Sequence, residues 1–199
     1  MGMGKQAKIL NKKQIDTVLK CLETSRYPIR DRVMFLLSVK AGLRAKEIAS
    51  LTWAMVTDPQ GELAVSIELT DAASKGKGGR SIPMHKHLKV ALAELKAARG
   101  VRATPDNAVI HSERSNVIGG MSGNAIAVKF HRLYSGLNFD GCSSHSGRRT
   151  FITEAAKKAP QAGGSLRDVQ EMAGHASLAT TQRYIQGSTD AKRKLMDLI

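Results

Sequence analysis

The amino-acid sequence predicts a mainly α-helical domain with one small antiparallel β-sheet. Over most of the chain, apolar residues recur every three or four positions, which is the period of an amphipathic helix. One stretch, Leu63 to Leu69, instead alternates apolar and polar residues, as a strand does. A second extended stretch, Arg80 to Met84, follows a glycine-rich basic turn and is predicted to pair with the first. The 199 residues have the length of one domain.

Three helices are predicted before the first strand. Asn11 and Gln14 have the spacing of a capping box at the start of the first helix. Pro28 suits the first turn of the second helix, and Gly42 is placed to end it. A short third helix is expected from Ala45 to Trp53.

Helices also dominate the part that follows the hairpin. Serines supply most of the expected caps, because a side-chain oxygen accepts a hydrogen bond from a free N–H at a helix start. The elements are expected at 87–99 (helix), at 108–110 (strand), from a Ser122 cap to 137, from a Ser143 or Ser144 cap to 158, from a Ser165–Asp168 capping box to Gly174, at 180–185 and at 189–198.

The composition favours a polyanionic partner. Lys and Arg total 31 against 17 Asp and Glu, so the formal net charge is +14. A surface with this excess attracts phosphates and releases their counterions. A ribosomal or simply basic protein has a similar excess, so the charge needs a second observation before it points to DNA.

No feature of the sequence indicates a membrane or secreted protein. No apolar run approaches the roughly 18 residues of a membrane span, and the first ten residues lack the apolar segment of a signal peptide. The two cysteines, Cys21 and Cys142, are far apart and form no CxxC pair, which favours a reducing compartment. We therefore expect a cytoplasmic protein without a membrane partner.

Four segments carry residue types that can cut DNA without a metal ion. That reaction needs a nucleophile for phosphorus, cations for the non-bridging oxygens and an acid for the leaving 5′ oxygen. Arg44 opens a predicted helix, where a guanidinium is well placed for phosphate. Lys75 lies at the tip of the predicted hairpin and could reach bound DNA. Taken singly, a surface arginine and a solvated basic turn are the simpler interpretations.

The C-terminal third supplies the remaining groups. His145 and Arg148 are three residues apart, so both fall on one face of the first turn of a helix. His175 follows the predicted end of a helix, and Tyr184 lies nine residues later. Taken singly, these residues also suit a capping histidine, a surface arginine and a packed tyrosine.

The order and the contexts of these residues together resemble the tyrosine recombinase (phage integrase) family. The patterns GLRxxEIxxLxW, KGxxxRxxP, HxxR and GHxxxxTTxxY all occur, and the matching stretches run from about Leu10 to Gln186. The resemblance implies the fold of the family's catalytic domain over residues 1–199. The family's usual N-terminal DNA-binding domain has no counterpart in this sequence, so we expect a core-only recombinase or a catalytic-domain fragment.

The resemblance implies a role for each of these residues. Tyr184 would attack the phosphodiester, form a 3′-phosphotyrosyl bond and free a 5′ hydroxyl. Arg44 and Arg148 would hold the scissile phosphate. Lys75 would be the general acid, and we prefer it to Lys77 because it precedes the first glycine, as the family's lysine does. No metal ion or other cofactor would be needed.

The remaining expectations concern protons, DNA and assembly. His145 would assist proton transfer, and His175 would hydrogen-bond the phosphate. Lys77, Arg80 and Arg149 are expected to contact DNA. The partner would be double-stranded DNA in a prokaryotic cytosol or nucleoid, with four protomers assembled on paired sites. The apolar tail that ends the chain would dock on a neighbouring protomer or pack on its own domain.

One motif departs from the family pattern. The family often reads HDLRHT, whereas this chain has His145-Ser-Gly-Arg148-Arg149-Thr150. Arg149 adds a charge, and Gly147 is expected to loosen the first helical turn.

Two other functions remain open from the sequence. A type IB topoisomerase uses a similar set of residues to nick and reseal one strand. A DNA-binding regulator without catalysis would have lost at least one of these positions, and all of them are present. A metal site at His85-x-His87 would require a third ligand, which the sequence does not suggest.

Overall fold

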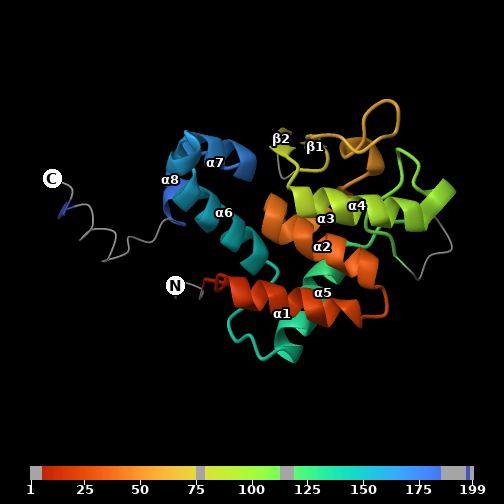
Figure 1. Cartoon of the computed structure of the whole chain (residues 1–199), viewed down its shortest axis with the longest axis horizontal. Helices are drawn as coiled ribbons and strands as arrows, with labels where there is room; N and C mark the ends of the chain where they lie inside the picture. The colour runs from red at the N-terminus through yellow and green to blue at the C-terminus, as the bar shows by residue number, and fades with distance from the viewer. Residues whose placement is uncertain (1–5, 75–78, 113–118, 185–195, 198–199) are drawn as a thin grey trace.

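The computed structural model describes residues 6–74, 79–112, 119–184 and 196–197. These residues confirm a mainly helical fold with one antiparallel two-stranded sheet (Figure 1). The elements are α1 (Lys12–Glu23), α2 (Pro28–Ala41), α3 (Ala45–Ser50), β1 (Ser66–Leu69), β2 (Arg80–Pro83), α4 (Lys86–Arg99), α5 (Gly123–Gly136), α6 (Ser146–Lys158), α7 (Leu166–Ala173) and α8 (Leu178–Gln182). Single turns of 3-10 helix lie at Trp53–Met55, Gly100–Arg102 and Pro160–Ala162.

Most helix starts follow the predicted local chemistry. The capping box at Asn11 and Gln14 is present, as is the one at Ser165 and Asp168. Ser122 caps α5 through the backbone N–H of Ala125. Pro28 opens α2, and Gly42 ends it with a φ of 66°, a left-handed conformation that glycine adopts without strain.

The hairpin is shorter than predicted. β1 begins at Ser66 rather than Leu63, and its register pairs Ser66 with Pro83 and Leu69 with Arg80. Leu63 instead forms an isolated bridge with Thr57. The expected strand at 108–110 is also wrong, because Ala108 forms only an isolated bridge, with Thr52.

Three helix boundaries also differ from prediction. α3 ends at Ser50, and the chain continues through a 3-10 turn at Trp53–Met55. Neither Ser143 nor Ser144 caps α6: His145 is the residue before the helix, and the Ser143 hydroxyl accepts its backbone N–H at 3.2 Å. α8 begins two residues early, at Leu178. The helix predicted at 189–198 lies outside the described residues, except for Met196 and Asp197.

The described apolar side chains form two clusters of unequal size. The larger cluster combines residues of α1 to α5 and the sheet, with Trp53, Phe35 and Phe130 among its fully buried members. The smaller one joins Ile152 of α6 to Val169 and Ala173 of α7. α6, α7 and α8 accordingly stand together at one end of the molecule (Figure 1).

Two glycines allow α6 to cross α2 closely. A Cβ at Gly147 would overlap the Ser38 hydroxyl and lie 2.9 Å from Ser38 Cβ. A Cβ at Gly42 would overlap the ring of Phe151. Gly147 is buried within a regular helix, so it serves close packing and does not loosen the first turn. This crossing fixes Arg148, the next residue of α6, against the end of α2.

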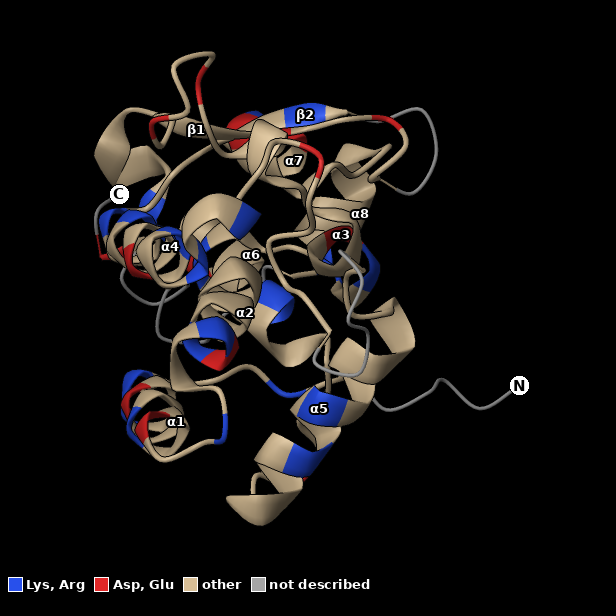
Figure 2. Ribbon diagram, turned by 90° about the vertical axis from the view of Figure 1, so that its right-hand side faces the viewer, with Lys and Arg blue, Asp and Glu red and all other residues tan. Residues whose placement is uncertain are grey.

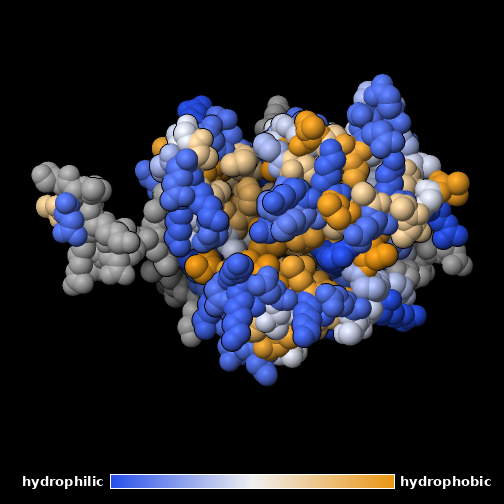
Figure 3. Space-filling model, viewed as in Figure 1, coloured by the Kyte–Doolittle hydropathy of each residue, from blue (hydrophilic) through white to orange (hydrophobic). Residues whose placement is uncertain are grey.

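The surface matches the basic composition. Lys and Arg positions occur along α1, α4, α5 and α6 (Figure 2). Hydrophilic residues cover most of the face in Figure 3, and apolar residues appear there in small separate areas. Among the described residues, no helix is both long and apolar enough to cross a membrane.

Candidate catalytic site

Arg148 lies between the two apolar clusters and hydrogen-bonds to both sides. Its side chain is 4% exposed. Nη1 donates to the carbonyl of Gly42 at 2.7 Å, and Nη2 donates to the carbonyl of Ala173 at 2.5 Å. Both carbonyls belong to helix C-termini, where the helix dipole favours a cation. Burial and the nearby Arg44 charge lower the pKa of Arg148, although a guanidinium remains protonated at neutral pH.

Glu47 gathers three arginines around one buried carboxylate. Arg44, at the start of α3, donates through Nη1 to Glu47 Oε1 at 2.7 Å. Arg80, at the start of β2, donates through Nη1 and Nη2 to the two carboxylate oxygens at 3.1 Å each. Arg148 Nη1 lies 4.0 Å from Oε2. One carboxylate therefore holds together guanidiniums that come from three separate segments.

The charge of Glu47 is maintained by these partners. Burial alone raises its pKa, but hydrogen bonds from Arg80 and from the Arg44 backbone, together with their charges, outweigh burial, so the net pKa is lowered. The side chain is 2% exposed. A buried carboxylate is stable when it is paired and hydrogen-bonded in this way.

His175 and Tyr184 stack on each other next to this cluster. Their ring centroids are 5.4 Å apart, with an interplanar angle of 22°. Gly174 ends α7 with a φ of 60°, which places His175 in the turn before α8. Nδ1 of His175 lies 2.9 Å from the hydroxyl of Thr181. When that hydroxyl donates, Nε2 carries the proton and becomes a hydrogen-bond donor.

His175 is neutral over most of the pH range. Burial, and then the charges of Arg148, Arg44 and Arg80, lower its pKa to about 4, although Glu47 opposes them. A neutral imidazole among three guanidiniums can donate one hydrogen bond without adding to their mutual repulsion.

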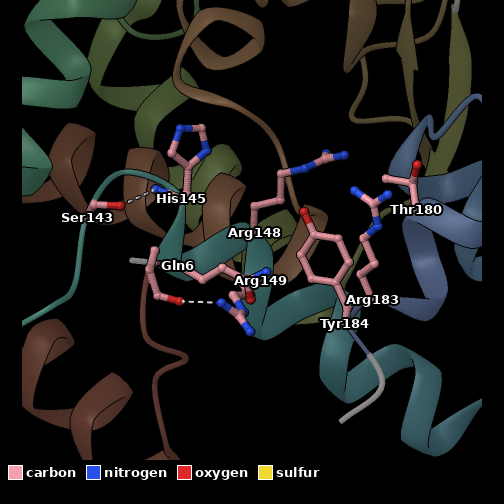
Figure 4. A pocket seen from close by; sticks show the side chains of 9 residues that line it. Gln6, Ser143, His145, Arg148, Arg149, Thr180, Arg183 and Tyr184 are labelled. Atoms are coloured by element: carbon pink, nitrogen blue, oxygen red, sulfur yellow. Dashed lines mark hydrogen bonds between the residues drawn. The ribbon is translucent and has the colours of Figure 1, made fainter. Parts of the chain in front are cut away.

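Tyr184 faces a pocket of about 420 Å³ that is rich in arginine. Figure 4 shows its hydroxyl pointing toward Arg148, with Arg183 beside it. His145, Arg148, Arg149 and Arg183 line the pocket, and no acidic side chain is among its lining residues. His145 is exposed at the start of α6. The pocket suits an anion of the size of a phosphodiester.

The N-terminal segment forms one wall of the same pocket. Gln6 and Ala7 line it, and Arg149 Nη1 donates to the Ala7 carbonyl at 3.0 Å (Figure 4). Leu10 is tied to α6 as well, since its backbone N–H donates to the Thr150 hydroxyl at 2.8 Å. The guanidinium of Arg149, the extra arginine of the His145–Thr150 motif, thus donates a hydrogen bond to a backbone carbonyl.

The structure brings together five of the predicted site residues. Arg44, His145, Arg148, His175 and Tyr184 converge as described above, whereas Lys75 and Lys77 lie outside the described residues. Arg80 is close to the site, but its guanidinium is bonded to Glu47 and to the Met172 carbonyl. Its contact with DNA, like that of Arg149, stays a prediction.

The His85-x-His87 pair is part of a helix start. Nδ1 of His85 accepts the backbone N–H of His87 at 3.1 Å, so one ring nitrogen caps α4. Within the described part of the chain, no group of three or more His, Cys, Asp or Glu side chains could hold a metal ion.

Sequence reasoning missed three residues of the site. Glu47 lay within the GLRxxEIxxLxW pattern without a role of its own, and it accepts the Arg44 backbone N–H at 2.8 Å. Thr181 lay within the GHxxxxTTxxY pattern without a role of its own. Arg183 directly precedes Tyr184, and no local pattern singles it out as part of the pocket.

The fold and this cluster of arginines, histidine and tyrosine define a class of protein. The model of the phage integrase family matches residues 8–190, so the chain belongs to that family. Tyrosine recombinase XerD of Rickettsia conorii is 30% identical over 97% of this chain and 64% of the relative. Tyrosine recombinase XerC of Pelobacter propionicus is 28% identical over 88% of this chain and 53% of the relative.

Solved structures support the same fold. The XerA recombinase structure matches with a TM-score of 0.74 and 22% identity, over 97% of this chain and 65% of that one. The XerH site-specific recombinase bound to a palindromic difH substrate matches with a TM-score of 0.75 and 19% identity, over 98% of this chain and 53% of that one. The chain thus spans between half and two thirds of the length of these relatives.

Proposed function

We propose that this chain breaks and rejoins double-stranded DNA in site-specific recombination, through a covalent bond between Tyr184 and a 3′ phosphate. The observation that carries the proposal is the cluster of Arg44, Arg148 and His175 next to Tyr184, whose ring stacks on His175 and whose hydroxyl points toward Arg148 (Figure 4). These four residues come from four separate segments, and packing alone does not require two guanidiniums and an imidazole to meet near a tyrosine. Membership of the family and the net charge of +14 support DNA as the substrate.

The proposed chemistry combines the positions of the described groups with the roles that the family resemblance implies, including that of Lys75. The Tyr184 oxygen attacks phosphorus, a new P–O bond forms, and the bond to the 5′ oxygen breaks. The tyrosine proton leaves to solvent or to His145, and Lys75 protonates the leaving oxygen. Attack by a 5′ hydroxyl of the exchanging strand reverses the step. Because one phosphoester replaces another, the reaction needs no energy source.

The arginines account for most of the proposed stabilisation. Arg148 is fixed by two backbone carbonyls, so it is preorganised for the charge that develops on the non-bridging oxygens. Arg44, with a 28% exposed side chain, retains nitrogens that a phosphate can reach. Removing a fixed donor of this kind costs about 3–4 kcal/mol of transition-state stabilisation.

A nicked suicide substrate tests the proposal. Loss of the short fragment next to the nick prevents religation, so a covalent protein–DNA adduct should accumulate with the wild-type chain. Tyr184→Phe should abolish the adduct. Arg148→Ala should slow its formation by about 100- to 1,000-fold. An adduct that persists at the wild-type level in Tyr184→Phe would refute the assignment.

Tyr134→Phe is the matched control. It makes the same chemical change in the main core, where the Tyr134 hydroxyl is buried and has no hydrogen-bond partner among the described residues. The adduct should form at the wild-type rate. A strand-exchange assay with two DNA sites then distinguishes recombination from nicking and resealing of one strand. Failure to form any adduct would favour a DNA-binding regulator.

A further inference from the structure

Arg80 has a set of contacts that its expected role in DNA binding does not explain. Its side chain is 7% exposed. Nη1 and Nη2 donate to the two oxygens of Glu47, and Nε donates to the Met172 carbonyl at 2.8 Å. Unlike Arg148, Arg80 is not among the residues that line the pocket that Tyr184 faces, so a guanidinium engaged through all three nitrogens presents little to a phosphate in that pocket.

The contacts of Arg80 connect three elements of the site. Arg80 begins β2, Glu47 belongs to α3, and Met172 lies in the last turn of α7. Arg148 takes the next carbonyl of α7, that of Ala173. Two arginines from different segments therefore fix the C-terminus of α7 directly before the turn that carries His175.

The turn itself is packed on Arg80. Gly174 has a φ of 60°, and a Cβ at this position would lie 2.8 Å from Arg80 Nη1. The Arg80 guanidinium thus fills the space that a side chain at Gly174, the residue before His175, would need. Arg80 is also five residues after Lys75, at the base of the hairpin, where Gly79 donates to Asp71 Oδ1 at 2.6 Å.

We propose that Arg80 is a positioning residue, which couples the base of the Lys75 hairpin to Glu47 and to the His175 turn, and that it does not contact DNA. It acts through Glu47 on Arg44 and through α7 on His175. The proposal deepens the proposed function, and its cleavage test rests on that function.

The first experiment separates positioning from DNA contact. Arg80→Met and Arg80→Lys are compared with Arg167→Met, a control on α7 whose side chain is 77% exposed. DNA affinity is measured by fluorescence anisotropy across salt concentrations, and cleavage by single-turnover adduct formation at saturating protein. Arg80→Met should leave affinity within about twofold and slow cleavage by about 10- to 100-fold, because small misplacements of catalytic groups are costly. Arg80→Lys should lie between Arg80→Met and the wild type, and Arg167→Met should match the wild type.

Two results of this experiment would overturn the proposal. A phosphate contact would weaken binding in Arg80→Met and reduce the slope of log affinity against log salt by about one. An unchanged cleavage rate in Arg80→Met would show that catalysis does not depend on the contacts of Arg80 with Glu47 and the His175 turn.

The second experiment follows His175 by NMR titration, with its signal assigned from a His175→Gln variant. The charged or titratable groups around this ring are Arg148 on α6, Arg44 and Glu47 at the start of α3, Arg80 on β2, and Tyr184 after α8. Arg80→Met removes a cation and leaves Glu47 less compensated, so the pKa of His175 should rise. Arg80→Lys should keep it low. A general loss of stability would lower the urea midpoint without moving this titration in the folded protein.

A double variant covers the case in which Arg80→Met does not fold. Arg80→Met with Glu47→Gln removes both members of the buried Arg80–Glu47 ion pair, so neither is left without the other, and Arg148 keeps its hydrogen bonds to the Gly42 and Ala173 carbonyls. It should fold and still cleave slowly, whereas a wild-type rate would refute the coupling. If even the wild-type chain forms no adduct, the proposed function fails, and the His175 titration decides the present proposal by itself.

Discussion

Site residues were predictable where a local sequence motif marks their chemistry. They were not predictable where their role depends on contacts between distant segments. Arg44, Arg148 and Tyr184 stand in recognisable motifs. Glu47 also stands in a motif, but its role was not predictable from it, because that role arises only when α6 and β2 bring Arg148 and Arg80 against the carboxylate that Arg44 already contacts.

The buried carboxylate of Glu47 leads to a prediction about stability. Glu47→Gln leaves Arg80 and Arg148 without their anion, which should reduce the free energy of unfolding at pH 7 by about 3 kcal/mol. The folded pKa of Glu47 lies below the ordinary value of 4.5, so its contribution is present above pH 4.5 and is lost as pH falls through the folded pKa. Urea titrations at pH 7 and pH 3 should therefore show a smaller difference in the free energy of unfolding between the wild type and Glu47→Gln at pH 3. A difference independent of pH would contradict this account of the cluster.

His175 gives a second pH prediction, in a different window. Its pKa falls from 6.5 to about 4 on folding, so between these values the unfolded chain binds a proton that the folded chain does not. Wild-type stability should therefore decline as pH falls from 6.5 to 4, by roughly 3 kcal/mol at most. His175→Gln should flatten this decline in urea titrations. Parallel curves for the two proteins would show that His175 titrates normally in the fold.

At the scale of elements, most helix ends that depend on neighbouring residues were predicted correctly, whereas features that depend on tertiary contacts were not. The capping boxes of α1 and α7 and the Gly42 end of α2 were predictable, since each depends on neighbouring residues. The strand at 108–110 failed, because an apolar run does not reveal whether a partner strand lies alongside it. α6 begins at Ser146, later than the predicted Ser143 or Ser144 cap implies, because its first turn packs against α2 at their crossing.

The crossing of α2 and α6 yields a prediction at this scale. Gly147→Ala places a methyl group against Ser38 and should lower the free energy of unfolding by about 1–3 kcal/mol, the usual cost of overpacking. Because Arg148 follows directly, adduct formation should slow as well. The control is Gly136→Ala in the last turn of α5, where a Cβ meets nothing within 4 Å. That variant should be neutral or more stable by up to about 1 kcal/mol. Equal midpoints for Gly147→Ala and the wild type in urea would contradict the packing argument.

At the scale of the molecule, the site lies where two apolar clusters meet. Arg148 bonds to the main body at Gly42 and to the α6–α8 end at Ala173, and Tyr184 packs on the smaller cluster. The fold class was predictable from hydrophobic periodicity, but the division into two clusters was not, since it depends on which helices pack together. The division leaves Tyr184 and Arg148 on the α6–α8 side of one junction and Arg44 on the other.

The net charge of +14 predicts strongly salt-dependent DNA binding. Each neutralised phosphate releases counterions, so log affinity should fall linearly with log salt. For six to ten phosphate contacts, affinity should drop by about 10³- to 10⁵-fold between about 50 and 200 mM salt. Fluorescence anisotropy with a duplex of unrelated sequence measures this electrostatic, sequence-independent part of the DNA affinity separately from recognition of a specific site. A flat salt profile would mean that the basic surface is not what holds the DNA.

The most direct test of the central claim is to identify the residue that carries the DNA after cleavage. The adduct from a suicide substrate is formed in the presence of EDTA, digested with trypsin and nuclease, and sequenced by mass spectrometry. We predict a nucleotide joined through its 3′ phosphate to Tyr184, from wild-type and Tyr134→Phe protein alike. A nucleotide on any other residue, a 5′ linkage, or an adduct that EDTA abolishes would contradict the account.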